Sequence, residues 1–285
     1  ARRSLLFSPG DRPEMLRKAP GVGADVVIFD LEDAVAPARK EEAREAVAAV
    51  LADRSFDPDC EVCVRVNPDS VVTDADLAAI QQPPTLDAIM LPKAGSAADV
   101  ETLAKLLDEH DLDVDVFAIA ETARGILHAE AIAETDPVTA LAFGAEDLSA
   151  DIGATRTTGL DEVAAARQHV VLAAAAAGID ALDTPYTDID DLDGLRDETR
   201  TAVRLGFDGK QAIHPAQIEV INEAFTPDVD EIEWARRVMT ARDEAEKADR
   251  GVFRVDGEMI DAPLITRAER IVDRARAAGV WESGG

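Results

Sequence analysis

Residues 116–125 read V-F-A-I-A-E-T-A-R-G, and residues 138–148 read V-T-A-L-A-F-G-A-E-D-L. Each stretch begins with an apolar run of strand length that a carboxylate follows: Glu121 comes directly after the first run, and Asp147 comes after the second run and its turn at Gly144. Apolar residues between the two runs keep helical spacing. A strand, a helix and a strand within about 30 residues have the size of one right-handed parallel crossover. We therefore expect two parallel strands that bring both carboxylates to the same edge of a sheet.

Two carboxylates at one sheet edge predict a site for a hard cation such as Mg²⁺, because carboxylate oxygens are its preferred protein ligands. Water and substrate oxygens would complete the coordination. The alternative is structural, since polar residues just after a strand often cap the next helix. Thr122 or Asp147, taken alone, fits that capping role.

Strand-like apolar runs alternate with helical patterns along most of the chain. The predicted strands are residues 4–7, 25–29, 62–66, 88–91, 116–120, 138–143, 179–182 and 209–213. Eight such units are what a parallel (β/α)8 TIM barrel requires. An open doubly wound sheet is the alternative, but no G-x-G-x-x-G follows any of these strands. The sequence therefore predicts an α/β barrel over residues 1–224.

The pattern changes after Pro215, and we assign residues 225–285 to a C-terminal extension. Helical periodicity covers residues 216–224, 228–250 and 263–278, and Asp256-Gly257 between short apolar runs is a hairpin signal. A barrel does not need these residues to close. We expect a helical and hairpin extension that serves as a lid or an oligomer contact.

The chain is strongly acidic, with 58 acidic against 29 basic residues among 285 and a formal charge of -29. This charge argues against nucleic acid as a partner. Lysine is scarce, and concentrated salt shortens the Debye length to about 3 Å at 1 M, so we infer a salt-adapted protein rather than an ordinary acidic one. No run of about 18 apolar residues predicts a membrane span, and the N-terminal stretch is too short for a signal peptide. We expect a cytoplasmic protein.

Cys60 and Cys63 form a C-x-x-C, which raises the question of a metal or redox site. The surrounding run E-V-C-V-R-V is strand-like, so positions three apart face opposite sides. No second cysteine pair completes a zinc site. We interpret both as buried strand thiols in a reducing compartment.

Reactive residues of such barrels lie at the carboxyl ends of the strands. The residues at those positions are Asp30, Glu32, Asp33, Arg65, Asn67, Lys93, Glu121, Asp147, Asp183 and His214. So many acids around one mouth would repel each other without a cation. Arg65 lies in an apolar strand, where its planar guanidinium suits a substrate carboxylate. A structural ion pair with Asp30 or Glu32 is the alternative.

Seven motifs in this order resemble one family over nearly the whole chain. They are R-S-L-L-F-S-P-G (3–10), D-L-E-D-A-V (30–35), R-V-N (65–67), L-P-K (91–93), I-A-E-T-A-R-G (119–125), F-G-A-E-D-L (143–148) and Q-A-I-H-P-A-Q (211–217). Together they resemble the citrate lyase β-subunit-like (CitE-like) family of the HpcH/HpaI aldolases, close to the malyl-CoA and citramalyl-CoA lyases.

The resemblance implies roles for residues at the barrel mouth. Glu121 and Asp147 match the ligands of Mg²⁺, which Mn²⁺ could replace. Arg65 matches the arginine that holds the keto acid's carboxylate, and Glu121 also belongs to the substrate-binding residues. Glu32 and Asp33 match acids that hold metal-bound waters in a second shell.

The resemblance also implies a coenzyme A site and a catalytic lid. Ile213, His214 and Pro215 match the segment that lies along the CoA adenine, which makes His214 a packing contact rather than a base. Arg12 and Lys18 are expected partners of the substrate's CoA phosphates. M-I-D-A-P at residues 259–263 matches the lid motif, so Asp261 would be the acid/base that acts in a neighbouring subunit of a homotrimer or hexamer.

The implied activity is Mg²⁺-dependent cleavage or formation of a malyl-CoA-type 3-hydroxyacyl-CoA. The products of cleavage would be acetyl-CoA or propionyl-CoA and glyoxylate or pyruvate. Two alternatives remain open. One is hydrolysis of the malyl-CoA thioester, and the other is a citrate lyase β subunit that acts on a carrier-bound thioester.

Overall fold

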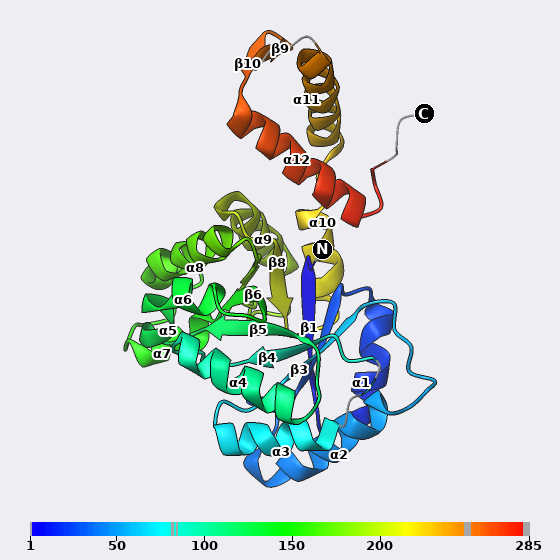
Figure 1. The fold of residues 1–285 in the computed structure, drawn as a ribbon, viewed down its shortest axis with the longest axis vertical. Coiled ribbons are helices and arrows are strands. Elements are labelled where there is room, and N and C mark those ends of the chain that lie inside the picture. The colour runs from blue at the N-terminus through cyan, green and yellow to red at the C-terminus, as the bar shows by residue number, and fades with distance from the viewer. Residues whose placement is uncertain (1, 81–82, 84, 248–251, 282–285) are drawn as a thin grey trace. The chain divides into compact units, whose positions relative to one another are not determined.

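The computed structural model describes residues 2–80, 83, 85–247 and 252–281. Arg2–Ile221 forms one compact unit, and Asn222–Gly285 belongs to a second. The first unit is a closed barrel of eight strands, in which each strand pairs in parallel with the next and β8 pairs with β1 (Figure 1). The predicted (β/α)8 barrel is therefore confirmed.

The strands agree with the predicted ones to within a few residues. They are β1 (Ser4–Pro9), β2 (Val26–Asp30), β3 (Glu61–Arg65), β4 (Ala88–Leu91), β5 (Asp115–Ala120), β6 (Val138–Phe143), β7 (Asp180–Asp183) and β8 (Gly209–Ala212).

Helices connect the strands around the outside of the barrel (Figure 1). They are α1 (Pro13–Lys18), α2 (Lys40–Leu51), α3 (Ser70–Ile80), α4 (Ala97–Glu109), α5 (Ala123–Leu127), α6 (Ala129–Ala133), α7 (Ala145–Asp151), α8 (Ala164–Ala177) and α9 (Leu192–Leu205), with short 3₁₀ turns η1 (Ala19–Val22), η2 (Pro37–Arg39) and η3 (Asp161–Val163). A further helix, α10 (Gln217–Phe225), follows β8. Thr122 caps α5, since its Oγ1 accepts a hydrogen bond from Gly125 N at 3.0 Å. Its predicted capping role is confirmed.

Alternate residues of strands β1 to β7 fill the inside of the barrel. Val26 and Ile28 of β2 and Phe117 and Ile119 of β5 belong to one buried apolar cluster, because side chains two apart along a strand share a face. The next position on that face of β5 is Glu121. The same alternation therefore builds the core and points the strand-end side chains into the mouth.

The amino ends of the strands are closed by an ionic cluster. The Arg2 guanidinium lies 2.7 Å from the Glu61 carboxylate and 3.1 Å from those of Asp115 and Asp180. These acids begin β3, β5 and β7. The guanidinium also lies 4.5 Å from the centre of the Phe117 ring. One arginine thus joins three strands, which leaves the opposite, carboxyl end for chemistry.

The second unit has its own apolar core. It contains α11 (Val229–Lys247), the antiparallel strands β9 (Phe253–Val255) and β10 (Glu258–Ile260), and α12 (Ala262–Ala277). Asp256 and Gly257 both have positive φ, 53° and 87°, as the predicted hairpin turn requires. The core includes Val238, Ile260 and Val272. The predicted helix over residues 228–250 ends outside the described residues, which stop at 247 and resume at 252.

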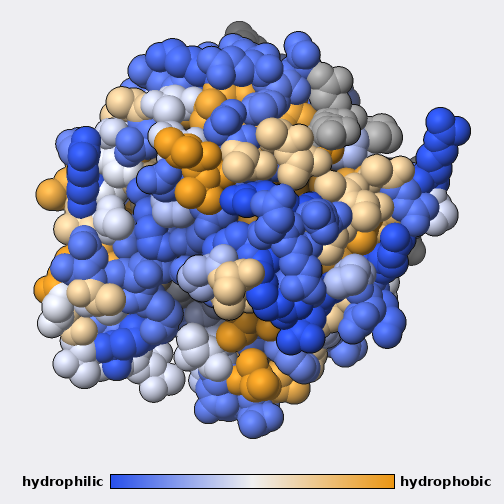
Figure 2. Space-filling view, turned by 90° about the horizontal axis from the view of Figure 1, so that it is seen from below, coloured by the Kyte–Doolittle hydropathy of each residue, from blue (hydrophilic) through white to orange (hydrophobic). Residues whose placement is uncertain are grey.

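The face shown in Figure 2 is mainly hydrophilic, with apolar residues in small separate groups. Within the described residues, no helix combines the length and hydrophobicity of a membrane span. Both thiols are free, but only Cys63 is buried; Cys60 is half-buried and precedes β3. The prediction of two buried strand thiols is therefore correct for Cys63 and wrong for Cys60.

Candidate active site

Glu121 and Asp147 line one cavity at the carboxyl end of the barrel. The cavity has a volume of about 250 Å³, and Arg65 and Asp30 also line it. Glu121 directly follows β5, and Asp147 lies in the first turn of α7, which follows β6. The predicted parallel crossover between these strands is present, with Ala120 of β5 beside Phe143 of β6. The fold therefore brings together the two carboxylates that the sequence singled out.

The Glu121 carboxylate has a tightly defined position. Its Oε1 accepts a hydrogen bond from the Lys93 backbone N–H at 2.8 Å, and Lys93 has a left-handed φ of 53°, which is uncommon for a residue other than glycine. On the other side, a Cβ at Gly144 would lie 2.6 Å from both Cβ and Oε2 of Glu121. Only glycine leaves room for this approach.

The electrostatics of Glu121 fit a cation site. Burial and, second, the charge of Asp147 raise the pKa of Glu121 to about 8, although the Lys93 N–H acts in the opposite direction. A divalent cation would favour the ionised form of both carboxylates. Within the described residues, no group of three His, Cys, Asp or Glu side chains could hold a metal. Two carboxylate ligands leave the other positions of a Mg²⁺ ion for water and substrate oxygens.

Arg65 forms ion pairs with Asp30 and Glu32, which was the alternative to a role in substrate binding. Its Nε and Nη2 donate to Asp30 Oδ1 and Oδ2 at 2.7 and 2.6 Å, and its Nη1 lies 3.1 Å from Glu32 Oε2. The guanidinium lies 4.7 Å from the centre of the Phe7 ring. Burial alone would lower the pKa of Arg65, but Asp30, Glu32 and Glu121 raise it. Arg65 is therefore a fixed, charged donor on the cavity wall.

Glu32 lies between Arg65 and a second cation. The Lys93 ammonium forms an ion pair with Glu32 Oε1 and lies 3.5 Å from Asp33 Oδ2. Burial raises the pKa of Glu32 despite the nearby Arg65 and Lys93. Glu32 Oε2 lies at ion-pair distance from Arg65, but no described residue donates a hydrogen bond to it. Its lone pairs are thus available to water, while Asp33 is exposed.

The residues predicted to bind coenzyme A lie just after β8 and on or before α1. Ile213 lines the same cavity, and the exposed His214 and Pro215 follow it. Arg12 and Lys18 are exposed on and before α1, and Arg12 Nε lies 3.7 Å from an oxygen of Asp11.

Asp261 lies in the second unit, where it is the N-cap of α12. Its side chain accepts a hydrogen bond from Leu264 N at 3.4 Å. The residue is exposed, although its side chain caps α12.

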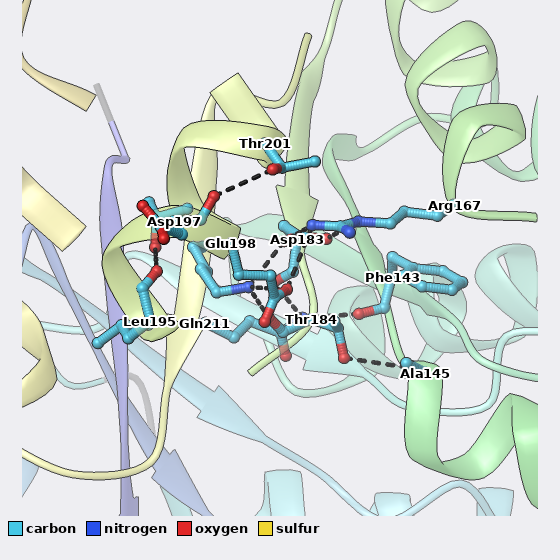
Figure 3. Close-up of polar contacts among 12 residues, drawn as sticks. Phe143, Ala145, Arg167, Asp183, Thr184, Leu195, Asp197, Glu198, Thr201 and Gln211 are labelled. Carbon is cyan, nitrogen blue, oxygen red and sulfur yellow. Dashed lines mark hydrogen bonds and ion pairs between the residues drawn. The ribbon is translucent and has the colours of Figure 1, made fainter. Parts of the chain in front are cut away.

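Asp183 was expected at the mouth with the other acids, and this expectation is wrong. Its carboxylate accepts two hydrogen bonds from Arg167, at 2.8 and 2.6 Å, and one from Lys210 at 2.7 Å (Figure 3). Glu198 Oε1 accepts from Lys210 at 2.9 Å and from Arg167 at 3.3 Å. Leu182 belongs to the inner cluster, so Asp183 points outward, toward α8 and α9.

Three polar residues at the mouth were missed. Thr184 and Gln211 line the cavity, and Gln217 Oε1 accepts from the backbone N–H groups of Ile213 and His214 at 2.9 and 3.2 Å. Gln211 and Gln217 are the two ends of the motif Q-A-I-H-P-A-Q. Their place in a motif was the signal that could have identified them.

Known proteins are similar to this chain over most of its length. The family model described as HpcH/HpaI aldolase/citrate lyase matches residues 3–215. A mitochondrial citramalyl-CoA lyase of Mus musculus is 37% identical over 291 residues, covering 96% of this chain and 86% of the relative. A (3S)-malyl-CoA thioesterase of Cereibacter sphaeroides is 37% identical over 282 residues, covering 99% and 97%.

A solved structure extends the comparison to ligands. The crystal structure of CitE from Mycobacterium tuberculosis in complex with magnesium, acetoacetate and coenzyme A has a TM-score of 0.80 and 40% identity, covering 97% of this chain and 98% of that one. The match of the family model over most of the chain, together with these relatives, shows that this protein belongs to the HpcH/HpaI aldolase/citrate lyase family.

Proposed function

We propose that this protein is a Mg²⁺-dependent carbon–carbon lyase that cleaves or forms malyl-CoA-type 3-hydroxyacyl-CoA thioesters. The observation that carries the proposal is the pair of carboxylates, Glu121 and Asp147, in one cavity with a fixed arginine. A relative at 37% identity is a citramalyl-CoA lyase, and a similar structure was solved with magnesium and coenzyme A. The cleaved bond joins the thioester α-carbon to the carbon that bears the hydroxyl.

Each residue has a part in this proposal. Glu121 and Asp147 would hold Mg²⁺, or Mn²⁺, and the ion would supply Lewis-acid polarisation of the keto acid's oxygens. Arg65 would bind the keto acid's carboxylate with the N–H groups that Asp30 does not occupy. Glu32 and Asp33 would orient waters around the ion, and Glu32 Oε2, which accepts no hydrogen bond from the described residues, supports this role.

Cleavage requires one proton to leave the substrate hydroxyl and one to reach the α-carbon of the thioester. We assign this transfer to Asp261, contributed by a neighbouring subunit of a trimer or a pair of trimers. Its exposed carboxylate at the start of α12 supports the assignment. The proposed CoA contacts are Arg12, Lys18 and residues 213–215, and the exposure of most of this surface leaves it open to a ligand.

Hydrolysis of malyl-CoA to malate is the second candidate, because a relative at 37% identity is a malyl-CoA thioesterase. Incubation with malyl-CoA, methylmalyl-CoA and citramalyl-CoA in turn, with Mg²⁺, separates the two. Glyoxylate or pyruvate together with an acyl-CoA indicates the lyase. Free malate with free CoA indicates the thioesterase. No turnover of the three thioesters, with activity only on a carrier-bound thioester, would favour a citrate lyase β subunit.

We also propose a salt-adapted protein of the cytoplasm. The formal charge of -29 supports the adaptation, since salt screens repulsion between exposed acids, and the free thiols support a reducing compartment. Circular dichroism should show structure that increases with added salt. Full structure without salt would contradict the adaptation.

A further inference from the structure

The segment Phe143–Ala145 determines where Asp147 lies relative to Glu121. It leaves β6 and enters α7, whose first turn carries Asp147. In its centre, Gly144 N donates to Ala120 O at 3.3 Å. A side chain at Gly144 would collide with Glu121. A shift of this segment would therefore change the spacing of the two carboxylates.

Thr184 holds the α7 end of the segment. The N-cap of α7 is Gly144, which has no side chain to bond the free N–H groups of the first turn. Thr184 supplies the missing acceptor from the end of the neighbouring strand, since Ala145 N donates to its Oγ1 at 3.1 Å (Figure 3). Thr184 is fully buried, and its carbonyl accepts from the Lys210 ammonium at 2.6 Å.

Gln211 holds the β6 end of the segment. Its side-chain Nε2 donates to the carbonyl oxygens of Phe143 at 3.0 Å and Asp183 at 3.1 Å (Figure 3). One buried amide thus joins the ends of β6 and β7. Because both of its N–H groups are used, Gln211 has no amide donor left for a ligand.

We propose that Thr184 and Gln211 are positioning residues that fix Asp147 opposite Glu121 for binding of a divalent cation. The inference rests on the proposed function, in which these two acids are the metal ligands. Thr184 and Gln211 act through the backbone of Phe143 and Ala145. Their loss therefore weakens cation binding before any substrate is present.

The test is isothermal titration of the metal-free, full-length protein with Mg²⁺ alone. Thr184→Val and Gln211→Met keep the side-chain volumes but remove the two ties, and each should raise the Mg²⁺ dissociation constant by about tenfold or more, as loss of an outer-shell partner does elsewhere. Thr184→Ser keeps the hydroxyl and should retain nearly wild-type affinity.

Two matched controls separate positioning from general loss of stability. Thr199 is a buried threonine of α9 whose Oγ1 donates to Leu195 O at 2.7 Å, and Gln168 Nε2 donates to Leu205 O at 3.4 Å. Thr199→Val and Gln168→Met should leave Mg²⁺ affinity unchanged, while the melting temperature records any loss of stability. Equal weakening of Mg²⁺ binding in these controls would overturn the inference.

The remaining outcomes distinguish this inference from the proposed function. Wild-type affinity in Thr184→Val and Gln211→Met, with binding lost in Asp147→Ala, overturns the positioning role alone. A fall in keto acid affinity without a fall in Mg²⁺ affinity also overturns it, because it indicates direct substrate contact. Absence of Mg²⁺ binding by the wild-type protein overturns both.

Discussion

Glu121 and Asp183 are buried carboxylates near the carboxyl ends of two barrel strands, yet their environments are opposite. Burial alone would raise the pKa of Asp183, but Lys210 and Arg167 hold it below its ordinary value. Burial and Asp147 raise the pKa of Glu121 to about 8, and Lys93 does not compensate. Asp183 forms ion pairs with two cations, whereas no side-chain cation among the described residues forms an ion pair with Glu121. The difference shows where the fold leaves room for an external cation.

The same contrast holds for the groups around each acid. Outside the barrel, two cations, Arg167 and Lys210, meet two carboxylates, Asp183 and Glu198. At the mouth, Arg65, Lys93 and the nearby Lys40 lie among a larger number of carboxylates, which include Asp30, Glu32, Asp33, Glu121 and Asp147. The outer network is balanced and structural. The mouth is short of positive charge, as a cation-binding site is before its ion arrives.

Removal of the metal-binding carboxylates should produce the largest effect. Glu121→Gln and Asp147→Asn keep the side-chain shape but remove the charge, and turnover of malyl-CoA should fall by about 10³-fold or more, because metal polarisation is worth several kcal/mol. Steady-state assays with Mg²⁺ measure this. Glu121→Gln should not destabilise the metal-free protein at pH 7, since a pKa of about 8 keeps the Glu121 side chain mainly neutral there, as glutamine is. Near wild-type turnover in either variant would show that the substituted carboxylate is not a required metal ligand.

Unlike Glu121 and Asp183, Asp261 is an exposed carboxylate. Asp261→Ala should lower turnover by about 10²–10⁴-fold, the usual contribution of a positioned acid or base. It should leave the Mg²⁺ dissociation constant unchanged, because Asp261 is not a proposed ligand. Parallel rate assays and metal titrations check both parts. Unchanged turnover would remove Asp261 from the chemistry, and loss of Mg²⁺ binding would give it a different role.

The outer network should respond in stability rather than in metal binding. Lys210→Met leaves Asp183 with one cation fewer inside the protein, and it should lower the free energy of unfolding by about 3–5 kcal/mol. Urea denaturation measures this change. The double variant Lys210→Met/Asp183→Leu should recover part of the loss. If Lys210→Met is as stable as the wild type, the ion-pair network does not contribute to the stability of the fold.

The smallest effect concerns pH. Because Glu121 has a pKa of about 8 in the metal-free protein, Mg²⁺ must displace a proton below that pH. Affinity should therefore rise by up to about tenfold per pH unit between pH 6 and 8 and then level off. The ionised form is the penalised one, so the metal-free protein should lose stability as pH rises from 4.5, the ordinary value, toward 8. Affinity that is independent of pH would contradict this environment.

Much of the fold could be predicted from strand periodicity. The eight strands, the parallel crossover and the pairing of Glu121 with Asp147 at one cavity follow from apolar runs that end at a carboxylate. The start of α8 at Ala164 is less evident from periodicity, because Leu160 shortly before it has a φ of 60° and cannot belong to the helix. The short helix α7 was not predicted, since seven residues behind a glycine N-cap carry little periodic signal.

The side-chain partners at the mouth were harder to predict. Asp183 is the last residue of β7 and Glu121 directly follows β5, but Asp183 lies next to the inward-facing Leu182 and so is on the outer face. A shift of one residue along a strand reverses the face of the side chain. The hydrogen bonds of Thr184 and Gln211 to the segment after β6 join residues far apart in the sequence. No local pattern encodes such contacts.

The most direct test of the central claim is an anomalous difference map from crystals of this protein soaked in Mn²⁺. We expect one strong peak in the barrel mouth, about 2.0–2.3 Å from a carboxylate oxygen of Glu121 and from one of Asp147, with lighter ligands completing the shell. A peak bound by other residues, or none at that place in crystals that hold Mn²⁺ elsewhere, would contradict the account.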